Sequence, residues 1–311
     1  MYKKLISFFS RHKIIIPLTV PANMKTTFEE HYYQATKGAG KLFLFAGDQK
    51  IEHLNSDFYG QGISPESADP AHLFTIASKG RIGAFATHLG LIARHGHRYH
   101  NINYIVKLNG KTNLIDETHD PMSGLLHSVN DVVDFAHATH LPIVGVGYTI
   151  YLGSQFEHHM LSQAAQIVHQ AHKHGLLAVL WIYPRGQAVK NERDISLIAG
   201  ATGVAASLGA DFVKVQPPEA EDSSASAKLL TQACAAAGTT GVICSGGSIA
   251  TEDSLLEAIH NQIFIGGARG VAIGRNIHQR DTIKAIALTK AIAAIVFDNA
   301  SVKEATKHLV G

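Results

Sequence analysis

This chain of 311 residues contains few cysteines, no long apolar run and no large excess of one charge. The only two cysteines, Cys234 and Cys244, exclude a disulfide scaffold and a cysteine-rich zinc site, and they suit a reducing cytoplasm. Lysine and arginine number 27 against 25 aspartates and glutamates, and this balance is typical of neither a broad nucleic-acid surface nor a membrane-binding surface. We therefore expect a cytoplasmic protein with neither nucleic acid nor membrane as a partner.

No stretch reaches the roughly 18 uncharged apolar residues that a membrane helix needs. The start, MYKKLISFF, loosely resembles a secretory signal, but charged residues at 11–13 interrupt it. The next apolar run, at 14–22, contains two prolines and is too short to span a bilayer. With 46% hydrophobic residues the chain has ample material for a core, and no Gly-, Ser- or Pro-rich linker divides it. We expect an N-terminal arm at 1–40 and one domain at 41–311.

Short apolar runs alternate with longer amphipathic stretches from residue 41 onward, which is typical of βα units. The runs predict eight strands, at 42–46, 83–87, 103–108, 142–147, 178–183, 211–215, 241–245 and 270–274. Eight strands separated by helices within about 250 residues predict an α/β fold of the (β/α)8 TIM-barrel class. A doubly wound open sheet is the competing fold. It would show a glycine-rich dinucleotide turn after the first strand, where this chain reads Gly47-Asp48-Gln49-Lys50.

The sixth predicted strand carries a lysine toward the barrel interior. Alternation along the strand places Val213 and Val215 on the helix side and Lys214 on the inner side. An apolar interior disfavours the ammonium form, so the pKa of such a lysine falls and its free amine can form a Schiff base with a carbonyl. The alternative is a lysine at the barrel rim that is paired with a neighbouring carboxylate.

Two aromatic residues have inward parity on the preceding strand, Trp181 and Tyr183. A tyrosine beside a Schiff-base lysine can transfer protons, because its hydroxyl both donates and accepts. The simpler interpretation is a core tyrosine with a satisfied hydroxyl and a tryptophan that fills volume.

Charged residues also follow the first and third predicted strands. Asp48 ends the first strand, and a carboxylate at that depth requires a partner such as a lysine or a substrate hydroxyl. Glu52 and His53 follow it in the loop. Lys107 has inward parity on the third strand, where it could hold a phosphate or balance the charge of Asp48. Lys111 lies in the next loop, where either role is open to it, but we interpret it as a surface charge.

Glycine-rich turns follow the last two predicted strands. The first contains Ser245, Gly246, Gly247 and Ser248, and the second contains Gly274 and Arg275 before Asn276. Glycine allows backbone N–H groups to approach an anion, and an arginine can add a bidentate contact. The loops at this position of TIM barrels frequently bind phosphate. The two turns together predict a phosphorylated substrate.

Twenty histidines require a metal site to be considered. They cluster at 95–100, at 158–159 and at 169–174, but no HExxH and no Cys/His pairing with zinc spacing occurs. Most fall in or near predicted outer helices, so we interpret them as structural. A metal-dependent barrel aldolase or hydrolase remains the minority hypothesis.

Six of these motifs, taken in order, resemble the archaeal-type class I fructose-bisphosphate aldolases, within the wider group of barrels that includes deoxyribose-phosphate aldolase. They are DQKIEH at 48–53, VKLNGKT at 106–112, WIYPRG at 181–186, GADFVK at 209–214, SGGS at 245–248 and GRN at 274–276. The resemblance covers about residues 41–279. One departure is Gln49-Lys50, where many archaeal members carry His-Gly.

The resemblance implies a metal-independent aldolase that uses no cofactor and commonly forms a homo-oligomer. Lys214 matches the Schiff-base lysine of the family and Tyr183 its proton-transfer tyrosine. Trp181 and Asp48 match residues of the substrate pocket, and the two glycine-rich turns match the site of one substrate phosphate.

The function implied is the reversible cleavage of fructose 1,6-bisphosphate to dihydroxyacetone phosphate and glyceraldehyde 3-phosphate. Two alternatives keep the Schiff base but change the reaction, namely an enzyme like aminodideoxyheptulosonate synthase and a thiolase acting on phosphorylated diketones. A barrel that binds a sugar phosphate without turnover is a further alternative. It is disfavoured because a pure binder needs neither Lys214 nor Tyr183.

Overall fold

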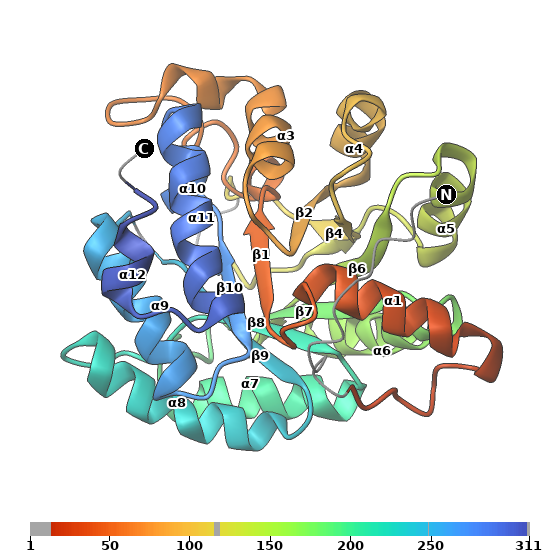
Figure 1. Cartoon of the computed structure of the whole chain (residues 1–311). Helices are drawn as coiled ribbons and strands as arrows, with labels where there is room; N and C mark the ends of the chain where they lie inside the picture. The colour runs from red at the N-terminus through yellow and green to blue at the C-terminus, as the bar shows by residue number, and fades with distance from the viewer. Residues whose placement is uncertain (1–13, 115–118, 248, 310–311) are drawn as a thin grey trace.

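A closed barrel of eight parallel strands forms the centre of the protein (Figure 1). The computed structural model describes residues 14–114, 119–247 and 249–309. The strands are β1 (Leu42–Ala46), β2 (Ala84–His88), β3 (Tyr104–Lys107), β6 (Ile143–Leu152), β7 (Leu177–Pro184), β8 (Phe212–Val215), β9 (Gly241–Ser245) and β10 (Gly270–Ile273). They pair in the order β1-β10-β9-β8-β7-β6-β3-β2, each parallel to its neighbours, so the predicted TIM barrel is confirmed.

Helices surround the barrel and connect its strands (Figure 1). The longer ones are α1 (Lys25–Thr36), α3 (Pro70–Lys79), α4 (Leu89–His95), α5 (Val129–Thr139), α6 (Glu157–Lys173), α7 (Ile195–Leu208), α8 (Ser223–Ala237), α9 (Glu252–Phe264) and α11 (Thr282–Asp298). The short ones are α2 (Gln49–Glu52), α10 (Arg275–His278), α12 (Val302–Thr306) and the 3-10 turns η1 (Ala22–Met24), η2 (Pro65–Ala68) and η3 (Gly96–Arg98). None of the helices in the described ranges is long and apolar enough to span a bilayer.

Two apolar clusters confirm the predicted alternation along β7 and β8. Leu180, Val213 and Val215 belong to the cluster between the barrel and the outer helices. Trp181 and Phe212 belong to the smaller cluster inside the barrel. Each fully buried large apolar side chain contributes about 1.5–3 kcal/mol to folding, so this in-out pattern also fixes the direction in which Lys214 points.

β6 is longer than expected. The sequence predicts a strand that ends at Gly147, whereas β6 continues to Leu152. Its pairing with β3 contains an irregularity near its start, which sets the parity of the rest of the strand. Gly147 faces inward, because a Cβ there would lie 2.4 Å from an atom of the Trp181 ring. The indole therefore occupies the space that a larger residue at 147 would fill.

Helix α1 packs at the end of the barrel where the strands begin, and it contacts β1, β2, β6 and β7 (Figure 1). Its buried side chains, Phe28, Tyr32 and Ala35, join the cluster inside the barrel. The Tyr32 ring stacks on Phe212 with 5.9 Å between centroids, and its hydroxyl accepts from Arg269 at 2.9 Å. The beginnings of the strands are thus covered by apolar packing, away from the ends that carry the polar residues.

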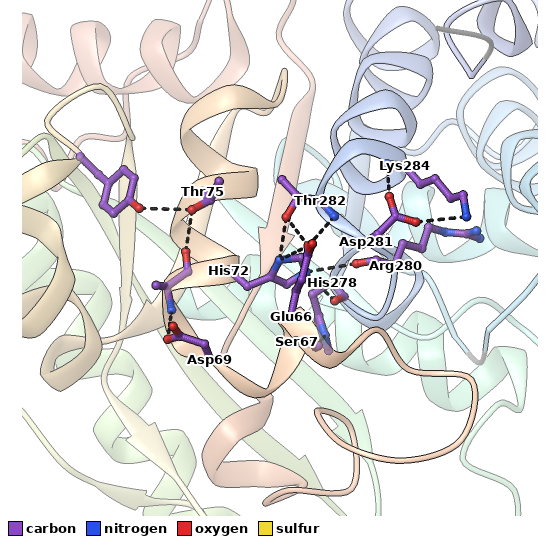
Figure 2. Close-up of polar contacts among 12 residues, drawn as sticks. Glu66, Ser67, Asp69, His72, Thr75, His278, Arg280, Asp281, Thr282 and Lys284 are labelled. Atoms are coloured by element: carbon purple, nitrogen blue, oxygen red, sulfur yellow. Dashed lines mark hydrogen bonds and ion pairs between the residues drawn. The ribbon is translucent and has the colours of Figure 1, made fainter.

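A polar network ties α3 to the turn between α10 and α11 (Figure 2). His72 Nε2 donates to the carbonyl oxygens of His278 and Arg280, at 3.0 and 3.1 Å. Glu66 accepts from both the backbone N–H and the hydroxyl of Thr282, at 2.8 and 2.5 Å. The His72 side chain is shielded from water, whereas Glu66 is half exposed, so the two His72 hydrogen bonds are the stronger part of the link between α3 and the end of α10.

Candidate active site

A cavity of about 400 Å³ opens at the carboxyl ends of the strands. The side chains and turns that line it come from β1, β6, β7, β8, β9 and β10 and the segments that follow them. Of the residues that the sequence singled out, those lining it are Asp48, Trp181, Tyr183, Lys214, Ser245, Gly246, Gly247, Gly274 and Arg275. Residues separated by more than 220 positions in the sequence therefore meet in one pocket, as expected for a TIM barrel.

Lys214 points into this cavity and is only 7% exposed. Its backbone pairs with that of Trp181 on β7, and its Nζ lies 5.6 Å from the centroid of the indole ring. Burial lowers the pKa of Lys214, and the charge of Lys107 acts in the same direction, whereas Asp48 opposes the shift. Within the described part of the chain, no hydrogen bond or ion pair to the Lys214 amine is found. The amine is thus uncharged more often than that of an exposed lysine, and it faces the cavity where a ligand can reach it.

Asp48 lies beside this amine and shares the barrel interior with Lys107. Lys107 Nζ is fully buried, 3.6 Å from Asp48 Oδ2 and 5.3 Å from the centroid of the Trp181 ring. Burial alone would raise the pKa of Asp48, but the charges of Lys107 and Lys214 outweigh it and hold that pKa below its ordinary value. Asp48 is therefore a carboxylate at neutral pH. The sequence left two roles open for Lys107, binding a phosphate or balancing the charge of Asp48. In the structure Lys107 lies beneath the cavity lining next to Asp48, a position that fits the second role.

Tyr183 stands two residues beyond Trp181 on the same face of β7 and lines the cavity with Lys214. Burial raises its pKa well above the ordinary value, and the negative charges of Asp48 and Glu52 raise it further. The phenol is therefore protonated at neutral pH and enters any reaction as an acid. In the described ranges its hydroxyl has no hydrogen-bond partner, which leaves it free to bind a substrate oxygen.

Glycines shape the opposite side of the cavity. A Cβ at Gly274 would lie 2.2 Å from Gln49 Nε2, and a Cβ at Gly246 would lie 2.8 Å from Ile273 Cδ1. Gly247 adopts a left-handed conformation with φ of 65°, and its carbonyl accepts from Arg275 at 3.2 Å. These close approaches require glycine, and they leave a backbone-lined hollow next to a guanidinium group.

Asn276 braces this hollow from behind. Its side chain donates to the carbonyl of Gly246 at 3.1 Å and accepts from the backbone N–H of Ala250 at 2.9 Å. Ser248, which the sequence placed in the same motif, lies outside the described residues. The brace fixes the turn after β9 to α10, so the two glycine-rich turns that the sequence identified form one wall.

The departure at Gln49-Lys50 leaves the cavity intact. Gln49 lines the pocket against Gly274. Lys50 points away from it, donates to the carbonyl of Ala68 at 3.1 Å and lies over the ring of Phe58 at 4.0 Å from the centroid. The lysine therefore anchors the loop after β1 instead of entering the site.

Some cavity residues were missed or given no role by the sequence. Tyr151 lines the pocket because β6 extends beyond its predicted end, and continued alternation through Thr149 was the available signal. Glu52, Arg185 and Arg193 also line it. They sit in short segments after strands, where no periodicity reveals a side chain's direction.

Histidines from two of the clusters in the sequence, His95 and His172, have structural contacts. Among the described residues, no three His, Cys, Asp or Glu side chains converge in a way that could hold a metal ion. His172 is fully buried between the Thr19 hydroxyl at 2.6 Å and Asp211 at 3.1 Å. His95 packs on Phe74, with 5.0 Å between ring centroids.

Comparison with known proteins places this site in a family. Residues 42–280 match the family described as DeoC/LacD family aldolase. The chain is 51% identical over 99% of its length, and 98% of the relative's, to a fructose-bisphosphate aldolase/6-deoxy-5-ketofructose 1-phosphate synthase of Methanocaldococcus jannaschii. It is 34% identical, over 86% of its length and 94% of the relative's, to a class 1 fructose-bisphosphate aldolase of Halobacterium salinarum.

Solved structures agree with this placement. A fructose-bisphosphate aldolase from Slackia heliotrinireducens superposes with a TM-score of 0.94 at 50% identity, covering 97% of this chain and 95% of the other. An archaeal fructose-1,6-bisphosphate aldolase, with its catalytic lysine bound to the carbinolamine intermediate, superposes with a TM-score of 0.75 at 32% identity, covering 87% and 99%. The chain therefore belongs to the DeoC/LacD aldolase family, and it is a lyase whose homologues include the archaeal-type class I fructose-bisphosphate aldolases.

Proposed function

We propose that this protein cleaves fructose 1,6-bisphosphate reversibly, with Lys214 as the Schiff-base residue. The observation that carries the proposal is the buried Lys214 amine, which faces the cavity that Tyr183 also lines and which has no bonding partner among the residues that the structure describes. Asp48 and Lys107 lie close enough to control the charge around it. A free amine, a protonated phenol and a carboxylate in one cavity are the groups that Schiff-base aldol chemistry requires.

The steps follow from this arrangement. The Lys214 amine adds to the C2 ketone, and loss of water from the carbinolamine leaves an iminium ion. In that dehydration Tyr183 gives its proton to the departing hydroxyl. The resulting phenolate is then our candidate for the base that takes the proton of the C4 hydroxyl. The C3–C4 bond then breaks, glyceraldehyde 3-phosphate leaves, and the bonding electrons move to the nitrogen as an enamine. Protonation of C3 and hydrolysis release dihydroxyacetone phosphate and restore the amine.

The cavity offers cationic groups on two sides for the two phosphates. We assign the phosphate next to the ketone to the hollow formed by Ser245, Gly246 and Gly247 with Arg275, because its backbone can approach an anion closely. Arg185 and Arg193 line another part of the same cavity and suit the distal phosphate. Both lie on the segment that follows β7.

A second reaction is favoured by the 51% identity to the Methanocaldococcus jannaschii relative. In 6-deoxy-5-ketofructose 1-phosphate, breaking the bond between C3 and C4 yields dihydroxyacetone phosphate and 2-oxopropanal. The same Lys214 enamine would make this bond with 2-oxopropanal as the acceptor. That acceptor carries no phosphate, so the reaction would not depend on a distal cationic site.

Two assays on the purified protein test the proposal. Release of dihydroxyacetone phosphate from fructose 1,6-bisphosphate measures the first reaction, and condensation with 2-oxopropanal measures the second. We expect Lys214→Met to abolish both, and Arg193→Met to raise KM for the bisphosphate at least tenfold while leaving the condensation nearly unchanged. Condensation without any bisphosphate cleavage would overturn the first assignment. Loss of neither reaction in Lys214→Met would overturn both.

A further inference from the structure

Glu52 lies in the short helix α2 with each of its carboxylate oxygens next to a different group of the cavity. Oε1 is 3.5 Å from the buried Lys107 ammonium. Oε2 accepts a hydrogen bond from the Tyr151 hydroxyl at 3.2 Å. The Glu52 side chain is 17% exposed, so both contacts are only partly screened by water. Glu52 thus links the end of β3 to the end of β6.

Tyr151 connects this carboxylate to the proton-transfer phenol. The rings of Tyr151 and Tyr183 lie 6.4 Å apart, at an interplanar angle of 32°. Tyr151 is almost fully buried, and Lys111 and Arg185 lie 5.8 and 5.9 Å from its ring centroid. A shift of Tyr151 would therefore move the wall against which Tyr183 is held.

The charges around Lys214 do not cancel without Glu52. Arg185 is held by Glu192 at 2.6 and 2.7 Å, and Arg275 Nε lies 3.9 Å from Asp57. Arg193 also lines the cavity, but it is exposed to water and donates to the backbone carbonyls of Pro217 and Pro218, and His53 pairs with Asp57 at 2.5 Å. The groups that remain around Lys214 are Asp48, Glu52, His88, Lys107, Tyr151 and Tyr183. Two carboxylates with one ammonium leave a single negative charge. An iminium ion at Lys214 supplies the matching positive charge.

We propose that Glu52 is a positioning residue of this site, whose carboxylate supplies the second negative charge that balances a cation at Lys214 and whose bond to Tyr151 fixes the wall beside Tyr183. Lys107 lies 3.6 Å from Asp48 and 3.5 Å from Glu52 and can neutralise only one carboxylate, so the site keeps an excess negative charge only while Glu52 is present. The pKa directions agree, because the charge of Glu52 raises the pKa of both Lys214 and Tyr183. This role rests on the proposed Schiff-base function for its chemical meaning.

The experiment measures the charge effect without any substrate. Lys214 is acetylated with limiting acetic anhydride across a pH series, and mass spectrometry maps the modified lysine. Only the free amine reacts, so the midpoint reports the titration of Lys214 itself. In Glu52→Gln we expect the midpoint to move to lower pH by about half a unit or more, because a nearby negative charge has been removed. The alkaline limb of the kcat profile moves the same way, since Tyr183 loses the same charge.

Two further variants separate charge from positioning. Glu221→Gln removes an exposed carboxylate outside the cavity and leaves the midpoint and kcat unchanged. Tyr151→Phe keeps every charge, so the midpoint stays while kcat falls about tenfold and KM changes little. A Glu52→Gln midpoint equal to that of Glu221→Gln refutes the charge-balancing role. Unchanged kcat in Tyr151→Phe refutes the positioning role, and this second test stands even if Glu52→Gln does not fold.

The failures of the two proposals are distinguishable. A protein that shows the predicted midpoint shift but neither cleaves nor forms aldol products would overturn the proposed function and leave the electrostatic role of Glu52 standing. An active aldolase whose Lys214 midpoint is unchanged in Glu52→Gln would overturn the electrostatic role of Glu52 and leave the proposed function standing.

Discussion

Replacing Lys107 by methionine tests how the site keeps two carboxylates inside a barrel. The Lys107 side chain is fully buried, and it lies 3.6 Å from Asp48 and 3.5 Å from Glu52. Methionine has a similar length but no charge, so the variant leaves both carboxylates without their ammonium. Removing one partner of a buried ion pair costs about 3–5 kcal/mol of unfolding free energy, and we expect a loss in that range at neutral pH.

The sign of the pH dependence follows from Asp48. Its pKa is depressed in the folded protein, so it stabilises the fold above its unfolded pKa and this contribution is lost as pH falls through the folded pKa. Without Lys107 the depression shrinks, and the difference in stability between neutral and acidic pH shrinks with it. Lys107 also lowers the pKa of Lys214, so in the variant that pKa rises and less free amine is present at pH 7. Each unit of rise would reduce the free amine about tenfold where the ammonium predominates.

Urea denaturation at pH 7 and at about pH 3, below the ordinary pKa of an aspartate, together with the pH profile of turnover, measures both effects. Lys111→Met is the matched control, because Lys111 is only partly buried and its amine donates to a backbone carbonyl at 3.1 Å. We expect the control to stay within about 0.5 kcal/mol of the parent. A Lys107→Met protein with parental stability and an unmoved acidic limb would refute the reasoning.

Three other substitutions or treatments have defined outcomes. Gly147→Ala places a Cβ 2.4 Å from the Trp181 ring, so we expect the unfolding free energy to fall by about 1–3 kcal/mol and the fluorescence of the only tryptophan to shift. An unshifted spectrum with parental stability would contradict the packing described. Tyr183→Phe removes the group that gives a proton in carbinolamine dehydration and takes one in C–C cleavage, so both steps slow and turnover falls by about 10²–10⁴-fold, as single-turnover kinetics would show. Parental turnover would exclude proton transfer by the phenol. Incubation with a strong chelator leaves activity unchanged, whereas loss that a divalent ion restores would favour the metal hypothesis.

Alternation in the sequence was enough to predict the barrel and the direction of Lys214. Apolar runs separated by amphipathic stretches located all eight strands, because a buried strand must be apolar on at least one face. The flanking valines at 213 and 215 identified the outward face, and parity then placed Lys214 inside, as the two apolar clusters confirm. The glycine-rich turns could be recognised in the sequence because their backbone conformation and close contacts, as at Gly247 and Gly274, favour glycine.

The partners of these groups could not be predicted in the same way. Glu52 sits in a four-residue helix within a loop, where no period assigns a direction, and its contact with Lys107 spans 55 positions. Tyr151 was missed because Gly147 read as the end of a strand, although the glycine is there to make room for Trp181. The strands β4 (Asn109–Gly110) and β5 (Gly124–Leu125) are too short for any pattern to reveal.

The most direct test is covalent capture at Lys214. Dihydroxyacetone phosphate is incubated with the protein, borohydride reduces any imine, and mass spectrometry locates the added mass. A stable adduct on Lys214, absent from Lys214→Met, is the predicted result. An adduct on another lysine that persists in Lys214→Met would contradict the assignment of this amine.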